Sequence, residues 1–359
     1  MNLKQNILIL SIAALLSGCG GGSASVADSA LSASLQAVQK GQITDNTTGE
    51  PIADVKVSIG DTITTTDTEG YYTLTDLIET DETTINFEKE GYLLGSTVIH
   101  IKRLTEDSTL SPNYLEFTMR AHKYQWDFES SEEVIGASIL LNASYIDVNG
   151  NPYTGTISAE LTILDLTTEE GKTLFTGSFK GIDSNGDIVQ FESFGLTSIL
   201  LGDSEGNALR FANGETGTLI FDNVSSSENP DTMPLWYYDY DQGLWVEEGY
   251  AELQADGTYR GEISSLGTWS LNKPLEEDPG IYRGRIIDEN GVPIGDVRVY
   301  AVGENWVSSD LTTDENGIFE LKVIPGDDFE LTAYDYQDKY GASYNNTIAA
   351  IASGDVVEN

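Results

Sequence analysis

The two histidines are the first residues to test for chemistry, because imidazole is the usual side chain in general acid–base catalysis and in zinc sites. His100 lies in the strand-like run 98–101, and His122 follows Met119-Arg-Ala. Neither has a Glu or a second His at the spacing of a metal or catalytic motif, and the chain has no nucleophile elbow or glycine-rich phosphate loop. Both histidines are predicted to be structural or surface residues.

Carboxylate pairs are the remaining route to catalysis. Such pairs are defined by distance in space, and with 59 Asp and Glu residues some pairs are inevitable whatever the function. The sequence therefore predicts a protein that is not an enzyme, with a carboxylate-dependent hydrolase as an open alternative.

The segment Asp183-Ser-Asn185-Gly-Asp187 has the opening spacing of a calcium-binding loop. The sixth and twelfth positions are Ile188 and Phe194, where an EF-hand needs Gly and Glu. Asp and Asn also populate turns for backbone reasons. The prediction is a turn, with weak calcium binding by Asp183, Asn185 and Asp187 as the alternative; no other cofactor is expected.

Aromatic side chains crowd the segment 235–245, which the turn at 239–243 predicts to be a hairpin. Aromatic faces stack on sugar rings, so carbohydrate contact is one hypothesis for Trp236, Tyr238, Tyr240 and Trp245. The favoured alternative is packing in a sandwich core. Because only one face of a half-exposed hairpin can be buried, some aromatic exposure is expected in either case.

The single cysteine, Cys19, ends the stretch Leu-Ser-Gly-Cys directly after the ten-residue apolar run 7–16. This arrangement resembles the lipobox of bacterial lipoproteins. The resemblance implies cleavage before Cys19 and lipid on its sulfur and amino group. Gly20, rather than Asp, is similar to an outer-membrane sorting signal. We therefore expect an outer-membrane lipid anchor, with the exposed side of that membrane undetermined.

The charge balance limits the partners. Lys and Arg number 18 against 59 acidic residues, a net charge of −41. A phosphate backbone would meet a repulsive field, so nucleic acid is excluded as a partner, and contact with anionic lipid is expected only through a covalent anchor. Hydrophobic residues make up 39% of the chain, enough for packed cores rather than an acidic disordered tail.

The chain also repeats itself. Residues 41–57 match 284–299, and residues 66–74 match 313–321. Each copy reads as a strand, a Gly- and Pro-containing turn, a strand with alternating valines, an Asp-x-x-Gly turn and another strand. Short strands at this spacing predict a small antiparallel β-sandwich.

The repeated pattern, G-x-[IV]-x-D-x-x-G-x-P followed by T-D-x-x-G-x-[YF]-x-L, strongly resembles the carboxypeptidase regulatory-like domain. That resemblance implies a transthyretin-like (prealbumin-like) seven-stranded sandwich without catalytic residues. Between the copies, P-L-W-x-x-D-x-x-x-G-x-W-x-x-x-G at 234–249 resembles part of astroprincin-type ectodomains, with cartilage intermediate layer protein as a looser relative.

The expected fold class is all-β, with tandem small sandwiches around a central β-rich domain. The predicted order is signal peptide (1–18), lipidated tether (19–38), regulatory-like sandwich (39–114), central module (115–274) and second regulatory-like sandwich (280–359). The expected function is binding, adhesion or scaffolding at the cell envelope. The expected partners are the membrane through its lipid, and either a polysaccharide or another envelope protein.

Overall fold

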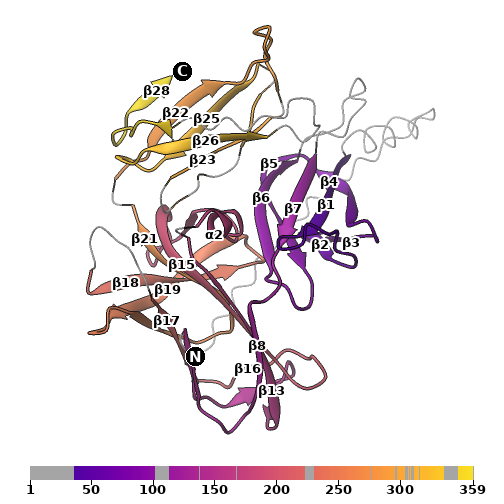
Figure 1. The fold of residues 1–359 in the computed structure, drawn as a ribbon, viewed down its shortest axis with the longest axis vertical. Coiled ribbons are helices and arrows are strands. Elements are labelled where there is room, and N and C mark those ends of the chain that lie inside the picture. Colours follow the sequence, from indigo (N-terminus) through magenta and orange to yellow (C-terminus); the bar gives the residue numbers. More distant parts are fainter. Residues whose placement is uncertain are drawn as a thin grey trace, which may run out of the picture. The chain divides into compact units, whose positions relative to one another are not determined.

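The chain is all-β, as predicted (Figure 1). The computed structural model describes residues 36–101, 113–136, 138–166, 168–222, 230–275, 277–295, 297–303, 306, 308, 311–314, 316–334 and 347–358. Residues Gln36–Asn359 form one unit, apart from Met1–Leu35. In the described ranges the helix α2 (Glu169–Thr173) is short, and no helix has the length and apolar character needed to cross a membrane.

Seven strands form the first sandwich from two small sheets, in the orders β4-β1-β7 and β3-β2-β5-β6. Apolar side chains alternate inward along these strands and enclose one core that includes Val57, Leu74 and Phe87. The strands are β1 (Gln36–Asp45), β2 (Lys56–Ile59), β3 (Thr62–Thr65), β4 (Tyr71–Ile78), β5 (Thr80–Glu88), β6 (Gly95–Ile101) and β7 (Tyr114–Met119).

The first sandwich ends later in the chain than predicted, because it includes strand β7. This strand pairs in parallel with β1, so residues 115–119 complete the first sandwich and do not open the central module. At the other end, β1 begins at Gln36, inside the segment predicted as tether. Parallel pairing joins segments far apart in sequence, and no local pattern signals it.

The C-terminal sandwich repeats the first, strand for strand. Its sheets have the orders β25-β22-β28 and β24-β23-β26-β27, and β22 again pairs antiparallel with one neighbour and parallel with the other. The strands are β22 (Gly280–Arg285), β23 (Arg298–Val302), β24 (Leu311–Thr312), β25 (Ile318–Val323), β26 (Phe329–Tyr334), β27 (Thr347–Ile348) and β28 (Val356–Glu358).

The repeat extends to a buried threonine. The Thr66 Oγ1 accepts the backbone N–H of Val55 at 2.9 Å, and the Thr313 Oγ1 accepts that of Val297 at 3.1 Å. The internal duplication predicted from the sequence is therefore a duplication of strand pairing and of core hydrogen bonds.

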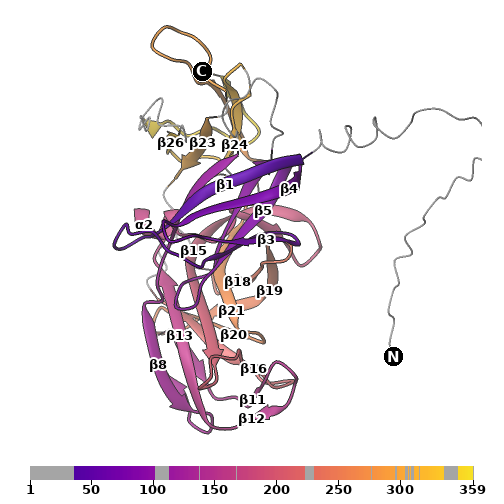
Figure 2. The same ribbon diagram turned by 90° about the vertical axis from the view of Figure 1, so that its right-hand side faces the viewer.

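The central module contains an eleven-stranded sheet in the order β8-β13-β15-β21-β18-β19-β20-β17-β10-β9, with β14 beside β15 and β19. A small sheet of three strands has the order β12-β11-β16, and Figure 2 shows it at the lower end of the module. The strands are β8 (Tyr124–Glu129), β9 (Val134–Ile135), β10 (Ile139–Leu141), β11 (Tyr145–Ile146), β12 (Pro152–Tyr153), β13 (Thr156–Leu164), β14 (Lys180–Ile182), β15 (Ile188–Gly202), β16 (Arg210–Phe211), β17 (Gly217–Phe221), β18 (Thr232–Asp239), β19 (Leu244–Leu253), β20 (Tyr259–Ile263) and β21 (Gly267–Pro274).

One type of hairpin loop, Asp-x-x-Gly-x, recurs in all three parts of the unit. The carboxylate of its first residue accepts the N–H groups of the third and fifth residues at 2.8–3.0 Å. The glycine has a φ of +73° to +89°, which other residues rarely adopt. The loops are 67–71, 147–151, 183–187, 203–207, 288–292 and 314–318.

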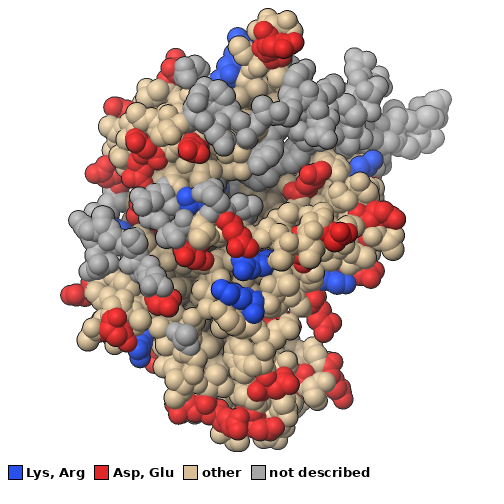
Figure 3. Space-filling view, in the orientation of Figure 1, with Lys and Arg blue, Asp and Glu red and all other residues tan. Residues whose placement is uncertain are grey.

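These loops account for part of the acidic composition, because the Asp in each is a local backbone acceptor. Figure 3 shows acidic side chains spread over the visible face rather than gathered in one patch.

Candidate functional site

The aromatic hairpin predicted at 235–245 is formed by β18 and β19. Its turn closes with a hydrogen bond from Gly243 N to the Asp239 carbonyl at 2.7 Å, and the Asp239 carboxylate accepts the N–H of Asp241 at 2.9 Å. Strand β18 also pairs with β21. The hairpin therefore lies inside the large sheet and not at its margin.

This position buries both faces of β18, contrary to the expectation that one would be exposed. Trp236, Tyr238 and Trp245 are 0% exposed, and so is Leu235 on the opposite face. Successive side chains of a strand point to opposite faces, so the two neighbours Leu235 and Trp236 enter different core clusters.

The burial of these rings shows that the carbohydrate hypothesis for this hairpin was wrong. A ring that stacks on a sugar needs a free face, whereas the Trp236 ring lies 5.2 Å from that of Phe191 and the Trp245 ring 5.3 Å from that of Phe175. The fourth residue, Tyr240, is partly buried, and its hydroxyl bonds the Thr268 Oγ1 at 2.9 Å. The favoured alternative, packing in the core, describes these side chains.

The hairpin instead fastens the first sandwich to the central module. The Tyr238 hydroxyl donates to Ser96 Oγ on β6 at 2.8 Å, and Ser96 donates to Asn86 Oδ1 on β5 at 2.6 Å. The Asn86 amide then donates to the carbonyl of Tyr240 at 3.0 Å. We call Ser96, Asn86, Tyr238 and Tyr240 the hairpin joint. Burial raises the pKa of Tyr238, so its hydroxyl keeps its proton at physiological pH.

A second connection between the first sandwich and the central module lies at helix α2. The Glu170 Oε1 accepts from Arg120 Nη1 at 2.8 Å and from Asn46 Nδ2 at 3.0 Å. Thr168 caps the helix by accepting the Gly171 N–H at 3.0 Å, which fixes the turn that carries Glu170. Sequence reasoning missed both connections, because the residues they join lie far apart in the chain.

His122 is buried where strand β13 meets the loop that contains Gly91. Its backbone N–H bonds the Gly91 carbonyl at 2.8 Å, and its Nδ1 lies 2.8 Å from Thr162 Oγ1. Its Nε2 lies 3.3 Å from Glu160 Oε2. Burial lowers the pKa of His122 to about 4, so the imidazole is neutral at pH 7. The structural role predicted for His122 agrees with this position, whereas the His100 side chain lies outside the described part of the chain.

We expect the free energy of unfolding to decrease as the pH falls from about 6.5 to 4. The unfolded chain binds a proton at His122 with a pKa near 6.5, and the folded chain with a pKa of about 4, so acid favours the unfolded state across this interval. The full effect is about 3 kcal/mol. Urea denaturation at a series of pH values measures it; a His122→Gln variant with the same slope as the wild type would contradict the assignment.

The predicted calcium segment is one of the Asp-x-x-Gly-x loops. The Asp183 carboxylate accepts the N–H groups of Asn185 and Asp187 at 2.9 and 2.8 Å, and the bond from Asp187 is the main cause that lowers the pKa of Asp183. No group of three acidic, His or Cys side chains able to hold a metal occurs among the described residues. The turn is present as predicted, and calcium binding stays a prediction.

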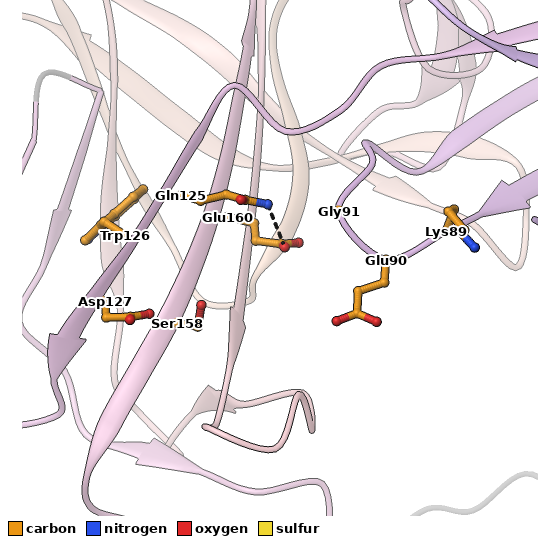
Figure 4. A pocket seen from close by; sticks show the side chains of 8 residues that line it. All are labelled: Lys89, Glu90, Gly91, Gln125, Trp126, Asp127, Ser158 and Glu160. Carbon is orange, nitrogen blue, oxygen red and sulfur yellow. Dashed lines mark hydrogen bonds between the residues drawn. The ribbon is translucent and has the colours of Figure 1, made fainter. Parts of the chain in front are cut away.

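A groove of about 620 Å³ opens between the first sandwich and the outer face of β8 and β13. Figure 4 shows Gln125 and Glu160 pointing toward each other across the two strands, with Glu90 projecting from the loop opposite. The Gln125 amide donates to Glu160 Oε1 at 3.1 Å. Lining residues are Lys89, Glu90, Gly91, Gln125, Trp126, Asp127, Ser158 and Glu160.

Sequence reasoning missed this groove because the loop 89–91 and strand β8, which form its two walls, lie more than thirty residues apart in the chain. Burial, and then the neighbouring Glu90 charge, raise the pKa of Glu160. The groove thus combines hydrogen-bonding side chains with an excess of negative charge. The lipidation residue Cys19, with the predicted signal peptide, lies outside the described residues.

No protein-family model matches the chain. Cartilage intermediate layer protein 1 of Mus musculus is 26% identical over 230 residues, which are 60% of this chain and 19% of that protein. The Homo sapiens protein is 25% identical over 227 residues, again 60% of this chain and 19% of that protein. The chain thus spans about a fifth of the length of these curated relatives. The looser resemblance predicted from the sequence is confirmed.

Solved structures with a likeness to the chain include bacterial pilin subunits. The major pilin BcpA of Bacillus cereus is 14% identical, with a TM-score of 0.20 and coverage of 90% of this chain and 98% of that one. The major pilin SpaD of Corynebacterium diphtheriae is 8% identical, with a TM-score of 0.23 and coverage of 90% and 96%. Likenesses with TM-scores this low carry no argument about this chain.

Proposed function

We propose that the protein is a non-enzymatic scaffold of the cell envelope, held at the outer membrane by lipid on Cys19. It presents loops on the first sandwich and on the central module, which the hairpin joint holds together, so that a partner meets several surfaces at a defined spacing. The partner is another envelope protein or a polysaccharide.

The observation that carries this proposal is the hairpin joint. Ser96, Asn86, Tyr238 and Tyr240 form a continuous chain of hydrogen bonds of 2.6–3.0 Å between the first sandwich and the large sheet. Buried networks of this kind fix one arrangement, because a shift leaves donors and acceptors unpaired. A sandwich and a central module linked only by a flexible tether would not need such a joint.

The lipid anchor is tested with Cys19→Ala. We expect the variant to leave the membrane fraction and to keep its uncleaved leader, because the cysteine sulfur is the site of lipid attachment. An anchor with several acyl chains is stable, since each buried CH₂ contributes about 0.8 kcal/mol. Membrane fractionation and intact-mass measurement of the mature protein check both expectations.

The matched control is Ser17→Ala, which keeps the cysteine and a small residue before it. Unchanged membrane retention and unchanged mass in Cys19→Ala would show that the anchor is wrong. The alternative of a carboxylate-dependent hydrolase stays a prediction from the sequence.

A further inference from the structure

We propose that the groove over β8 and β13 is the docking site for an extended, cationic segment of a protein partner. The segment adds as a strand to the outer edge of β8 and places a Lys or Arg side chain beside Glu160. This inference rests on the proposed scaffold function and names the class of partner.

The first argument is the edge of β8. This strand is last in the large sheet and, in the described part of the chain, pairs with β13 alone. The backbone N–H of Glu129 bonds the Glu132 carboxylate at 3.2 Å, and its carbonyl accepts the Glu132 N–H at 2.8 Å. Both groups of Glu129 therefore face away from β13.

Antiparallel pairing alternates, so every second residue of an edge strand faces outward. Counting back from Glu129, the outward residues are Asp127 and Gln125, and their side chains line the groove. Their N–H and carbonyl groups offer four hydrogen bonds to an added strand. Strand addition to an exposed sheet edge is a recurring mode of peptide recognition.

The second argument is charge. Glu90, Asp127 and Glu160 face the groove against the single cation Lys89. The raised pKa of Glu160 reports that burial and the neighbouring Glu90 carboxylate disfavour its charge. A Lys or Arg side chain in the groove relieves that repulsion and gains a charge-assisted hydrogen bond.

The third argument is an unpaired nitrogen beside Glu160. The His122 Nε2 has no hydrogen-bond partner, although the His122 side chain is 0% exposed and Glu160 Oε2 lies 3.3 Å away. This nitrogen is sealed from the groove, and the imidazole is neutral at pH 7, so His122 does not offset the charge of Glu160. A Lys or Arg side chain on the groove side of Glu160 supplies that opposite charge, which an anionic or apolar ligand does not.

Short, acidic edge strands also deter aggregation without binding anything. That alternative predicts no defined affinity for an added strand, so a binding experiment separates the two. It also distinguishes the groove from the diffuse attraction of the chain's net charge of −41 for any cation.

The probe is a fluorescein-labelled octapeptide of alternating Lys and Thr, titrated with the full-length protein in detergent micelles at physiological salt and followed by anisotropy. We expect saturable binding that weakens at least tenfold in Glu160→Gln. The matched control is Glu252→Gln, an exposed carboxylate on β19, which we expect to change affinity less than twofold.

The backbone pairing is tested on the ligand, so that the protein fold is untouched. The same octapeptide with N-methyl groups on alternate residues keeps its charge and loses the strand hydrogen bonds; one of its two methylation registers is expected to abolish binding. Gln125→Pro, which removes an outward N–H, should have the same effect.

No saturable binding, equal binding by Glu160→Gln, or equal binding by both methylated peptides would overturn the docking site. Each of these results leaves the membrane release of Cys19→Ala unaffected, so a failure here is distinguishable from a failure of the lipid-anchored scaffold.

Discussion

Replacing Trp236 by alanine is expected to destabilise the folded protein by about 3–5 kcal/mol. The side chain is 0% exposed, its ring packs 5.2 Å from that of Phe191, and its Nε1 donates to the Asn272 carbonyl at 3.2 Å. Truncation leaves a cavity and an unpaired acceptor in the middle of the large sheet. Urea denaturation followed by circular dichroism measures the loss.

Two variants serve as controls for Trp236→Ala. Trp236→Phe keeps most of the volume, so we expect a smaller loss, whereas Tyr250→Ala removes an aromatic ring that is 55% exposed and should change stability by less than about 0.5 kcal/mol. Wild-type stability of Trp236→Ala together with lost retardation in a polysaccharide gel would restore the carbohydrate hypothesis and contradict the core assignment.

Gly317→Ala is expected to cost about 4 kcal/mol or more, the upper end for a single substitution. Its φ is +73°, and a Cβ there would lie 2.3 Å from the carbonyl oxygen of Ile286, a backbone atom that cannot rotate away. Gly70 is the equivalent residue in the first sandwich: its φ is +77°, and its Cβ would lie 2.5 Å from the Ile43 oxygen. The duplication therefore predicts the same effect twice.

The control in each copy is a glycine with similar φ and free space. Gly291 has a φ of +81° and Gly49 a φ of +73°, and neither has an atom within 4 Å of a built Cβ. Alanine at these positions should cost about 1–2 kcal/mol, the strain of the left-handed conformation alone. Equal losses at Gly317 and Gly291 in thermal denaturation would show that backbone strain, and not the close approach, decides the effect.

The two sandwiches could be predicted because their signals are local. The Asp-x-x-Gly-x loops specify hairpins through one carboxylate and one glycine, and valines such as Val55 and Val297 alternate with polar residues around them. The same residues recur at both ends of the chain, so each copy supports the interpretation of the other.

The hairpin of Trp236 and Tyr238 could not be assigned in the same way. Its turn was predictable, but the burial of both its faces depends on β21, on the segment of Phe175 and on the first sandwich. The alternation of side chains along a strand predicts which of them share a face. It does not predict whether one face or both faces of the strand are covered by other parts of the protein. The expected aromatic exposure, and with it the carbohydrate hypothesis for this hairpin, was wrong for that reason.

By itself, the sequence determined the all-β class, the duplicated sandwich, the turns that contain part of the acidic residues, and a net charge of −41. These properties follow from neighbouring residues or from composition. Only the tertiary structure decided that Tyr238 reaches Ser96, that β7 returns to β1, and that Glu90 faces Glu160 across a groove. Each of those contacts joins distant segments, and its energy depends on burial and geometry that exist only after the chain has folded.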